Sequence, residues 1–281
     1  MTERALRRLL LLLTLALAGT ALASADAPSL RASLPESLQQ GALAIGRVAP
    51  GSQVQVDGRA VRVDESGRFL LAVARDAVEP LGLRWTDPAG RQHAQDIAVT
   101  PRDWPVEAVS GVPPRTVSPP PEIAARIARE QAAVAAARDR DDARSDFAEG
   151  FDWPLSGRIS GRFGASRSYN GKPGAPHSGM DIAAPTGTPI AAPAPGVISF
   201  ARPDLYLTGG TVLLDHGHGL SSVFLHLSRI DVTPGQRVER GQRIGAVGAT
   251  GRASGPHLHW GVNWFGTRLD PLLLPGLPAQ P

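Results

Sequence analysis

The order of apolar and polar positions predicts short strands in the first third of the chain. Four valines alternate with polar residues, at Val54, Val56, Val61 and Val63. The pairs Asp57-Gly58 and Ser66-Gly67 interrupt this alternation. Such a pattern is typical of half-buried strands joined by hairpin turns. We therefore expect residues 26–100 to form a small immunoglobulin-like β-sandwich that serves as an accessory or targeting domain.

The middle of the chain predicts a helix. A proline-bearing stretch, GVPPRTVSPPPE, leads into IAARIAREQAAVAAAR, where Ile123, Ile127 and Val134 recur at helical spacing. Pro121 stands at a favoured first helical position, and the pattern weakens after Arg138 into charged residues. Residues 101–150 are expected to be a proline-rich and helical linker that packs a narrow apolar stripe on a neighbour. A helix that binds a charged partner is the alternative.

From residue 151 to residue 281 the pattern returns to short strands. Segments such as GGTVLLDHG, SSVFLHLS and PGQRVERGQRIGAVGATG are separated by tight turns rich in glycine and proline. This arrangement predicts a compact all-β domain, so the whole chain is expected to be mainly β. Six of the seven histidines fall in this part, which makes it the place to look for chemistry.

The N-terminus has the features of a secretory signal peptide, assigned to residues 1–25. Three arginines precede an apolar run that starts at Leu9, and small residues follow at Ala21, Ala23 and Ala25. Cleavage is expected after Ala23 or Ala25. The apolar run is short for a membrane span, so no stable span is expected after cleavage; an uncleaved anchor is the alternative.

Composition narrows the chemistry further. The chain has no cysteine, which excludes disulfides, thiolate metal ligands and cysteine nucleophiles. The formal net charge of +3 is too small for a nucleic-acid-binding protein. Residues 151–281 hold 11 basic and 7 acidic residues. This excess of positive charge would suit binding to an anionic wall polymer. The alternative is that the basic residues simply lie on a solvated surface.

Histidine and aspartate residues form the strongest chemical pattern. In GPHLHW, His257 and His259 are two positions apart, so a strand would project both imidazoles from one face. In PHSGMD, His177 and Asp181 have the spacing H-x-x-x-D. Taken with His259, they offer two nitrogens and one oxygen, which is a catalytic zinc set that leaves a fourth position open.

A further histidine lies in the segment SSVFLHLS. Alternation places Val223, Leu225 and Leu227 together, and we expect these three to face the core. His226 is then expected on the opposite side, facing the site. The alternative is a structural histidine whose ring is hydrogen-bonded to a backbone carbonyl. The remaining pair in DHGHGL, His216 and His218, is separated by glycines that indicate a turn, so both are left outside the site.

These motifs, in this order and spacing, resemble the M23 metallopeptidases, also called lysostaphin-like or LytM-type endopeptidases. The resemblance extends from about Trp153 to Asp270 and includes GRFG, HSGMDIAAPTGTPI and GQRIGAVGATGRASGPHLHW. It implies that His177, Asp181 and His259 bind Zn²⁺, and that His226 and His257 are catalytic residues lining the cleft.

The resemblance also implies a function. The expected activity is that of a zinc-dependent endopeptidase that hydrolyses peptide crosslinks of bacterial peptidoglycan, with zinc-activated water as nucleophile and His226 and His257 assisting. The expected substrates are crosslinks between D-alanine and diaminopimelate. Glycine-rich bridges and elastin-like proteins are the alternative substrates. The alternative is a non-catalytic LytM-type activator of other cell-wall hydrolases.

The resemblance also implies a location and a mode of regulation. A periplasmic protein is expected, with secretion as the alternative. The region before Trp153 resembles segments that block the cleft in some relatives, so autoinhibition stands beside a spacer or docking role. A cell-envelope protein that activates or anchors the chain is a further expected kind of partner.

Overall fold

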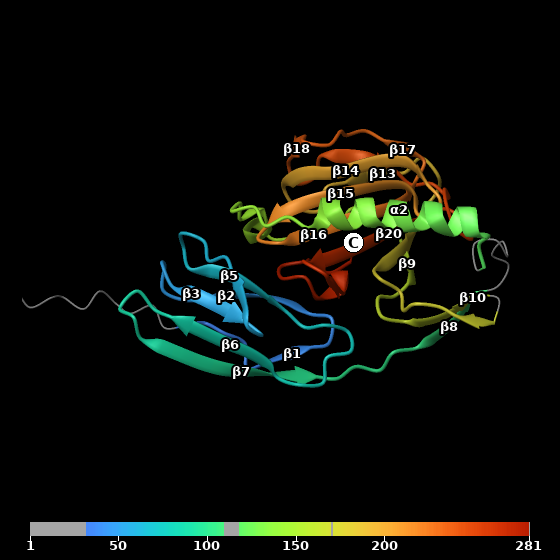
Figure 1. Cartoon of the computed structure of the whole chain (residues 1–281). Coiled ribbons are helices and arrows are strands. Elements are labelled where there is room, and N and C mark those ends of the chain that lie inside the picture. Colours follow the sequence, from blue (N-terminus) through green and yellow to red (C-terminus); the bar gives the residue numbers. More distant parts are fainter. Residues whose placement is uncertain (1–31, 110–117, 170, 281) are drawn as a thin grey trace, which may run out of the picture. The chain divides into compact units, whose positions relative to one another are not determined.

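The structure, a computed structural model, describes residues 32–109, 118–169 and 171–280 (Figure 1). The predicted signal peptide, residues 1–25, lies outside these ranges. Strands make up most of the regular structure, which confirms the mainly β class. Within the described ranges, no helix combines the length and the apolar character that a membrane crossing requires.

The N-terminal part is built from two small sheets. Its strands are β1 (Ser37–Gln39), β2 (Leu43–Arg47), β3 (Gln53–Val56), β4 (Arg59–Val61), β5 (Arg68–Ala72), β6 (Leu81–Thr86) and β7 (Gln92–Thr100). The larger sheet has the order β1-β7-β6-β3-β4, and β2 pairs with β5. Val54 and Val56 are buried while Gln53 and Gln55 are exposed, as the alternation predicts. The immunoglobulin-like topology and the boundaries at 26 and 100 stay predictions.

Only one of the two predicted hairpins forms. Asp57 and Gly58 take φ values of 45° and 76° between the antiparallel strands β3 and β4, as a tight hairpin requires. Gly67 also turns the chain, with φ at 81°. The strands on either side of it, β4 and β5, belong to different sheets, so the predicted hairpin at Ser66-Gly67 is wrong.

The predicted helix is confirmed as α2 (Pro121–Arg138), with Pro121 in its first turn. No residue of α2 is fully buried, because the helix lies on the surface of the C-terminal strands (Figure 1). Two contacts of its side chains hold it there. Arg126 donates to the carbonyl of Asp204, and Glu130 accepts from the backbone N–H of Tyr206 at 2.7 Å.

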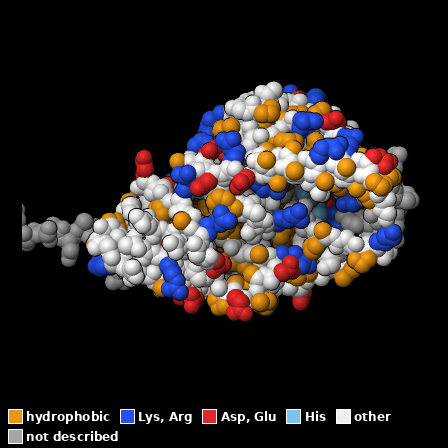
Figure 2. All heavy atoms as spheres, viewed as in Figure 1, with side chains coloured by type: hydrophobic (Ala, Val, Ile, Leu, Met, Phe, Trp, Pro, Cys, Tyr) orange, Lys and Arg blue, Asp and Glu red, His pale blue; other side chains and the backbone are white. Residues whose placement is uncertain are grey.

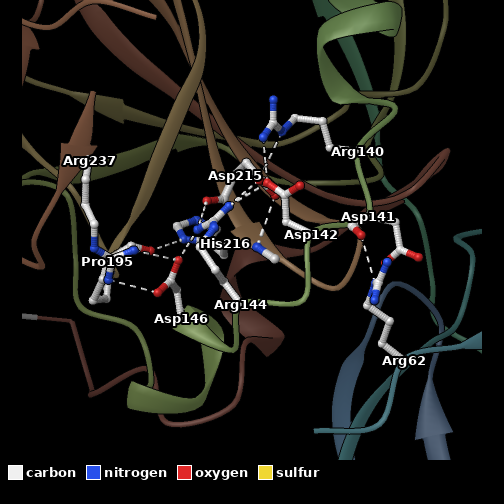
Figure 3. Close-up of polar contacts among 11 residues, drawn as sticks. Arg62, Arg140, Asp141, Asp142, Arg144, Asp146, Pro195, Asp215, His216 and Arg237 are labelled. Carbon is white, nitrogen blue, oxygen red and sulfur yellow. Dashed lines mark hydrogen bonds and ion pairs between the residues drawn. The ribbon is translucent and has the colours of Figure 1, made fainter. Parts of the chain in front are cut away.

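The stretch predicted as a linker also contributes to the C-terminal fold. Strand β8 (Val106–Val109) runs parallel to β10 (Ser166–Tyr169). The short helix η1 (Asp146–Glu149) inserts Phe147 into the core with 0% exposure. Figure 3 shows the charged residues beside η1, where Arg144 pairs with Asp146 and Asp215. Arg237 also binds Asp146, at 3.0 Å. This segment is therefore attached to the C-terminal fold by buried contacts.

The C-terminal part is organised around one large sheet. Its elements in chain order are β9 (Arg158–Gly161), β10 (Ser166–Tyr169), β11 (Lys172–Pro173), β12 (Met180–Ala183), β13 (Pro189–Ala191), β14 (Gly196–Leu205), β15 (Gly209–Gly217), β16 (Leu220–Leu227), β17 (Arg229–Ile230), β18 (Arg237–Val238), β19 (Arg243–Ala246), β20 (His257–Trp264), β21 (Thr267–Leu269) and η2 (Pro271–Leu273). The large sheet has the order β18-β14-β15-β16-β20-β12-β9, and β21 pairs with β20. Smaller sheets β11-β10-β8 and β13-β19-β17 accompany it.

A bulge in β16 overturns the predicted orientation of its aliphatic residues. Phe224 pairs with Val212 and Leu227 with Gly210, so β16 holds one residue more than β15 in this interval. Before the bulge, Phe224 packs in the core while Val223 and Leu225 line a cavity. Of the three residues expected in the core, only Leu227 packs there.

Candidate metal centre

The two central strands of the site bring Asp181 and His259 together. These residues are directly opposite each other in the antiparallel pair β12 and β20, so their side chains leave the same face of the sheet. His177 comes from the segment that leads into β12, and its backbone N–H donates to the carbonyl of Ala165. The segment that carries His177 is thus hydrogen-bonded to the residues just before β10.

The three side chains converge on one point. His177 Nε2 lies 3.0 Å from both His259 Nδ1 and Asp181 Oδ1, and the last two atoms are 2.9 Å apart. Tetrahedral zinc with bonds of 2.0–2.1 Å holds neighbouring ligand atoms roughly 3.3 Å apart. All three residues are buried, and they form a cluster with the spacing of metal ligands. The predicted ligand set is thus brought together.

Hydrogen bonds around the cluster show that it suits a cation. His177 Nδ1 donates to the carbonyl of Arg162 at 2.9 Å, which leaves Nε2 without a proton in the neutral ring. This nitrogen and the carboxylate of Asp181 are then two acceptors at 3.0 Å. Two lone pairs at this distance repel each other unless a positive charge lies between them, so the residues fit a bound metal.

Burial and charge favour the ligand forms of these groups. Burial acts to raise the pKa of Asp181, but the proximity of His177 and His259 outweighs it and holds the pKa below the usual range. Burial lowers the pKa of His259 to about 4, although Asp181 opposes this shift. A carboxylate and neutral imidazoles are the protonation states that bind zinc.

The other two predicted histidines stand beside the cluster. His226 and His257 have ring centroids 4.8 Å apart, and His257 Nε2 lies 3.8 Å from Asp181 Oδ1. His226 reaches the site because its φ of 66° at the bulge turns its side chain to the cavity. His226 therefore lies at the cavity, but simple alternation along β16 does not account for its orientation. His216 and His218 lie outside the lining of this cavity, as expected.

Each of these two imidazoles is oriented by a backbone carbonyl. His226 Nδ1 donates to Thr250 at 2.8 Å, and His257 Nδ1 donates to Gly255 at 2.8 Å. Both neutral rings therefore present an Nε2 lone pair. Burial lowers the pKa of His226 to about 3, with further lowering by the charges of His259 and His257.

A cavity of about 630 Å³ gives access to the cluster, and it is lined by His177, His226, His257 and His259. Figure 2 shows histidine side chains at the bottom of this hollow, with basic side chains beside it. Because three protein ligands face an open cavity, a metal here keeps a position for water or substrate, as catalytic zinc sites do.

Sequence reasoning missed several residues that shape the site. Arg167 donates to Asp181 Oδ2 at 2.9 Å and pairs with Glu107 at 3.2 Å. A Cβ at Gly179 would lie 2.8 Å from His259 Nε2, and one at Gly161 would lie 2.5 Å from Asp181 Oδ2. The glycines of HSGMD and RISGRFG are the signal that was available, because glycine marks a close approach of backbone to a site.

Fold and site define a class, namely β proteins with a catalytic-type zinc site made of two histidines and a carboxylate. The sequence profile of Peptidase family M23 matches residues 175–271. A solved structure from Pseudomonas aeruginosa, described as a peptidase M23, is 32% identical, with a TM-score of 0.63 over 84% of this chain and 94% of that chain. The chain belongs to peptidase family M23, a family of zinc enzymes.

Curated relatives match part of this chain. Peptidoglycan DD-endopeptidase ShyA of Vibrio cholerae is 46% identical over 104 residues, which cover 37% of this chain and 24% of ShyA. Cell division protein DipM of Caulobacter vibrioides is 33% identical over 154 residues, which cover 55% of this chain and 24% of DipM. The matched region thus spans about a quarter of the length of these relatives.

Proposed function

We propose that this chain is a zinc-dependent endopeptidase that hydrolyses peptide crosslinks in bacterial peptidoglycan. The observation that carries the proposal is the convergence of His177, Asp181 and His259 beside two further imidazoles in an open cavity. The names of relatives support the substrate class, since ShyA is a peptidoglycan DD-endopeptidase and Mpg of Neisseria meningitidis is a DD-carboxypeptidase/endopeptidase.

His177, Asp181 and His259 would hold the zinc ion. A zinc ion at this position supplies Lewis acidity, which polarises a peptide carbonyl and lowers the pKa of water towards neutrality. The protein contributes a cavity in which a peptide can lie beside the three ligands, and it fixes His177 through the carbonyl of Arg162. Arg167 holds the second carboxylate oxygen of Asp181.

His226 and His257 are proposed to move protons during the reaction. Their Nδ1 atoms are engaged with backbone carbonyls, so each neutral ring offers only Nε2 to the cavity, as a proton acceptor. The ring that accepts a proton from the attacking water becomes a donor, and it can then protonate the leaving amine. The second ring offers the same kind of lone pair, so it can accept the remaining proton of the attacking water as the carboxylate product forms.

The presence of all five residues favours catalysis over the alternative role as an activator of other hydrolases. An activator needs a binding surface, but it does not need three ligand atoms within 4.8 Å of one another beside two oriented imidazoles. The three protein ligands also argue against a structural zinc, which normally has four.

Export and the scissile bond are parts of the same proposal. The N-terminal arginines and apolar run suit a signal peptide, and peptidoglycan as substrate requires the periplasm or the exterior. Bonds between D-alanine and diaminopimelate are the proposed target. An activating or anchoring envelope protein remains a proposed partner.

Digestion of purified peptidoglycan by the zinc-loaded protein tests the function. We expect crosslinked fragments to be lost, the loss to stop with a zinc chelator, and added zinc to restore it. Asp181→Asn serves as the matched inactive variant. Fragments released equally by wild type and Asp181→Asn would refute the proposal.

A further inference from the structure

A second cavity lies beside the metal site, between helix α2 and strands β16, β20 and β21. It measures about 400 Å³, and its lining includes Ser178 and His259, which also line the metal cavity. The two cavities therefore meet at a metal ligand. A peptide held at the metal site can extend into the second cavity, so its lining can select substrates.

Arg138, the last residue of α2, lines this second cavity. Its Nε atom is buried, and it has no hydrogen-bond partner among the described residues. Burial lowers the pKa of Arg138, and the positive charge of Arg268 lowers it further. A guanidinium that loses water and stands near another cation costs free energy unless an anion compensates for it.

Arg268 approaches the same cavity from the sheet. It lies on β21 opposite Asn263 of β20, and it lines both cavities. Within the part of the chain that the structure describes, neither Arg138 nor Arg268 forms an ion pair with a carboxylate. The two arginines thus supply positive charge without a protein counter-ion.

The carboxylate that lines this cavity is already engaged. Glu130 accepts from Arg126 Nε at 2.6 Å and from the backbone N–H of Tyr206 at 2.7 Å. It is two helical turns away from Arg138, so it cannot neutralise the pair at the end of the helix. The rest of the wall near β16 is apolar, with Val223 and Leu225.

We propose that Arg138 and Arg268 form a binding site for a carboxylate group of the peptide substrate. The inference rests on the proposed function, since it names a selectivity of that same site. Asn263, the partner of Arg268, is four positions from His259 on β20, which is about 13 Å along a strand. An extended peptide rises about 3.3–3.6 Å per residue, so the carboxylate belongs to a residue about three to four positions from the scissile bond.

Peptidoglycan stem peptides provide suitable groups, because they contain γ-linked glutamate with a free α-carboxylate. The test uses two crosslinked muropeptide dimers, one with free glutamate carboxylates and one with these groups amidated. For the zinc-loaded full chain, kcat/KM is expected to be about 10- to 100-fold higher for the free form, the range of a charge-assisted hydrogen-bonded pair.

Three variants sharpen the test. Arg138→Gln and Arg268→Gln should each reduce the preference to within about threefold, because the larger loss of kcat/KM falls on the free form. Arg268→Lys should keep part of the preference. The control is Arg158→Gln, an exposed arginine on β9, which should behave as wild type.

A binding measurement separates this inference from the proposed function. Calorimetry compares a stem tetrapeptide with its glutamate amide on the zinc-loaded protein. If wild type cleaves neither dimer, the proposed function fails, whereas tighter binding of the free tetrapeptide that depends on both arginines still supports the subsite. Equal affinity for the two tetrapeptides overturns the subsite. Faster cleavage of both dimers by Arg138→Gln would also overturn it, because α2 would then obstruct the cleft.

Discussion

Asp181 and His259 are 78 positions apart in the sequence, yet they face each other across β12 and β20 with His259 Nδ1 2.9 Å from Asp181 Oδ1. Register fixes this pair, because a slip of one residue would send both side chains to the opposite face of the sheet. The metal site is therefore a property of the strand pairing, and loops supply only His177 and the residues that orient it.

Replacing His226 or His257 by glutamine should separate catalysis from metal binding. Neither side chain belongs to the three-ligand cluster, so zinc stoichiometry should stay that of wild type. Loss of general acid–base assistance should lower kcat by about 10²–10⁴-fold. Metal analysis and peptidase assays on the same samples check both statements. Loss of zinc from either variant would show that its histidine is a ligand.

Arg167 is predicted to be a positioning residue for Asp181. Its guanidinium donates to Asp181 Oδ2, so Arg167→Met should leave the carboxylate free to rotate. Outer contacts of this kind typically change metal affinity by about 10–100-fold. Competition with a zinc-binding dye measures the effect. The exposed Arg158→Met is the control, and equal zinc affinities for the two variants would rule out the positioning role.

Gly179 is predicted to be required for its lack of a side chain. In Gly179→Ala the new Cβ would lie 2.4 Å from the carbonyl oxygen of Trp260 and 2.8 Å from His259 Nε2. Because backbone atoms of β20 cannot retreat easily, we expect weaker zinc binding and a stability loss of about 1–3 kcal/mol. Gly266→Ala, where a Cβ meets open space, is the matched control. Wild-type zinc affinity in Gly179→Ala would contradict the steric argument.

Stability is predicted to fall on acidification through His216. Burial lowers the pKa of this imidazole from its ordinary 6.5 to about 4, although the carbonyl of Pro195 opposes the shift. Between these values the unfolded chain binds more protons than the folded chain, so the free energy of unfolding decreases as pH falls through this window. Between pH 7 and pH 5 the contribution of His216 is about 2 kcal/mol.

Urea unfolding of the zinc-loaded protein at both pH values measures this loss. His216→Gln, which keeps polar atoms near Pro195 and Ser222, should show a correspondingly smaller difference between pH 7 and pH 5. The same pH dependence in the variant and in wild type would exclude His216 as a source.

The sequence was sufficient for the parts of the site that local periodicity determines. Alternation in GPHLHW correctly placed His257 and His259 on one face, and Pro121 marked the start of α2. The side-chain orientation along β16 could not be predicted from local periodicity. Its bulge depends on a register difference with β15, which no pattern within SSVFLHLS encodes.

Contacts between distant segments of the chain also could not be predicted from the sequence. Arg167 reaches Asp181 because β10 and β12 are brought together by tertiary packing, and Arg138 meets Arg268 from a helix outside the family match. The stretch expected to be a linker contributes Phe147 to the core for the same reason. This stretch is rich in charged residues, and only the folded structure shows which of them form ion pairs.

The most direct test of the account is hydrolysis of one purified crosslinked muropeptide dimer by the zinc-loaded protein in water enriched in ¹⁸O, followed by mass spectrometry. The account predicts conversion to monomers, with one heavy oxygen in the new carboxylate, and no conversion by Asp181→Asn. A folded protein with one zinc per chain that leaves the dimer intact would contradict it.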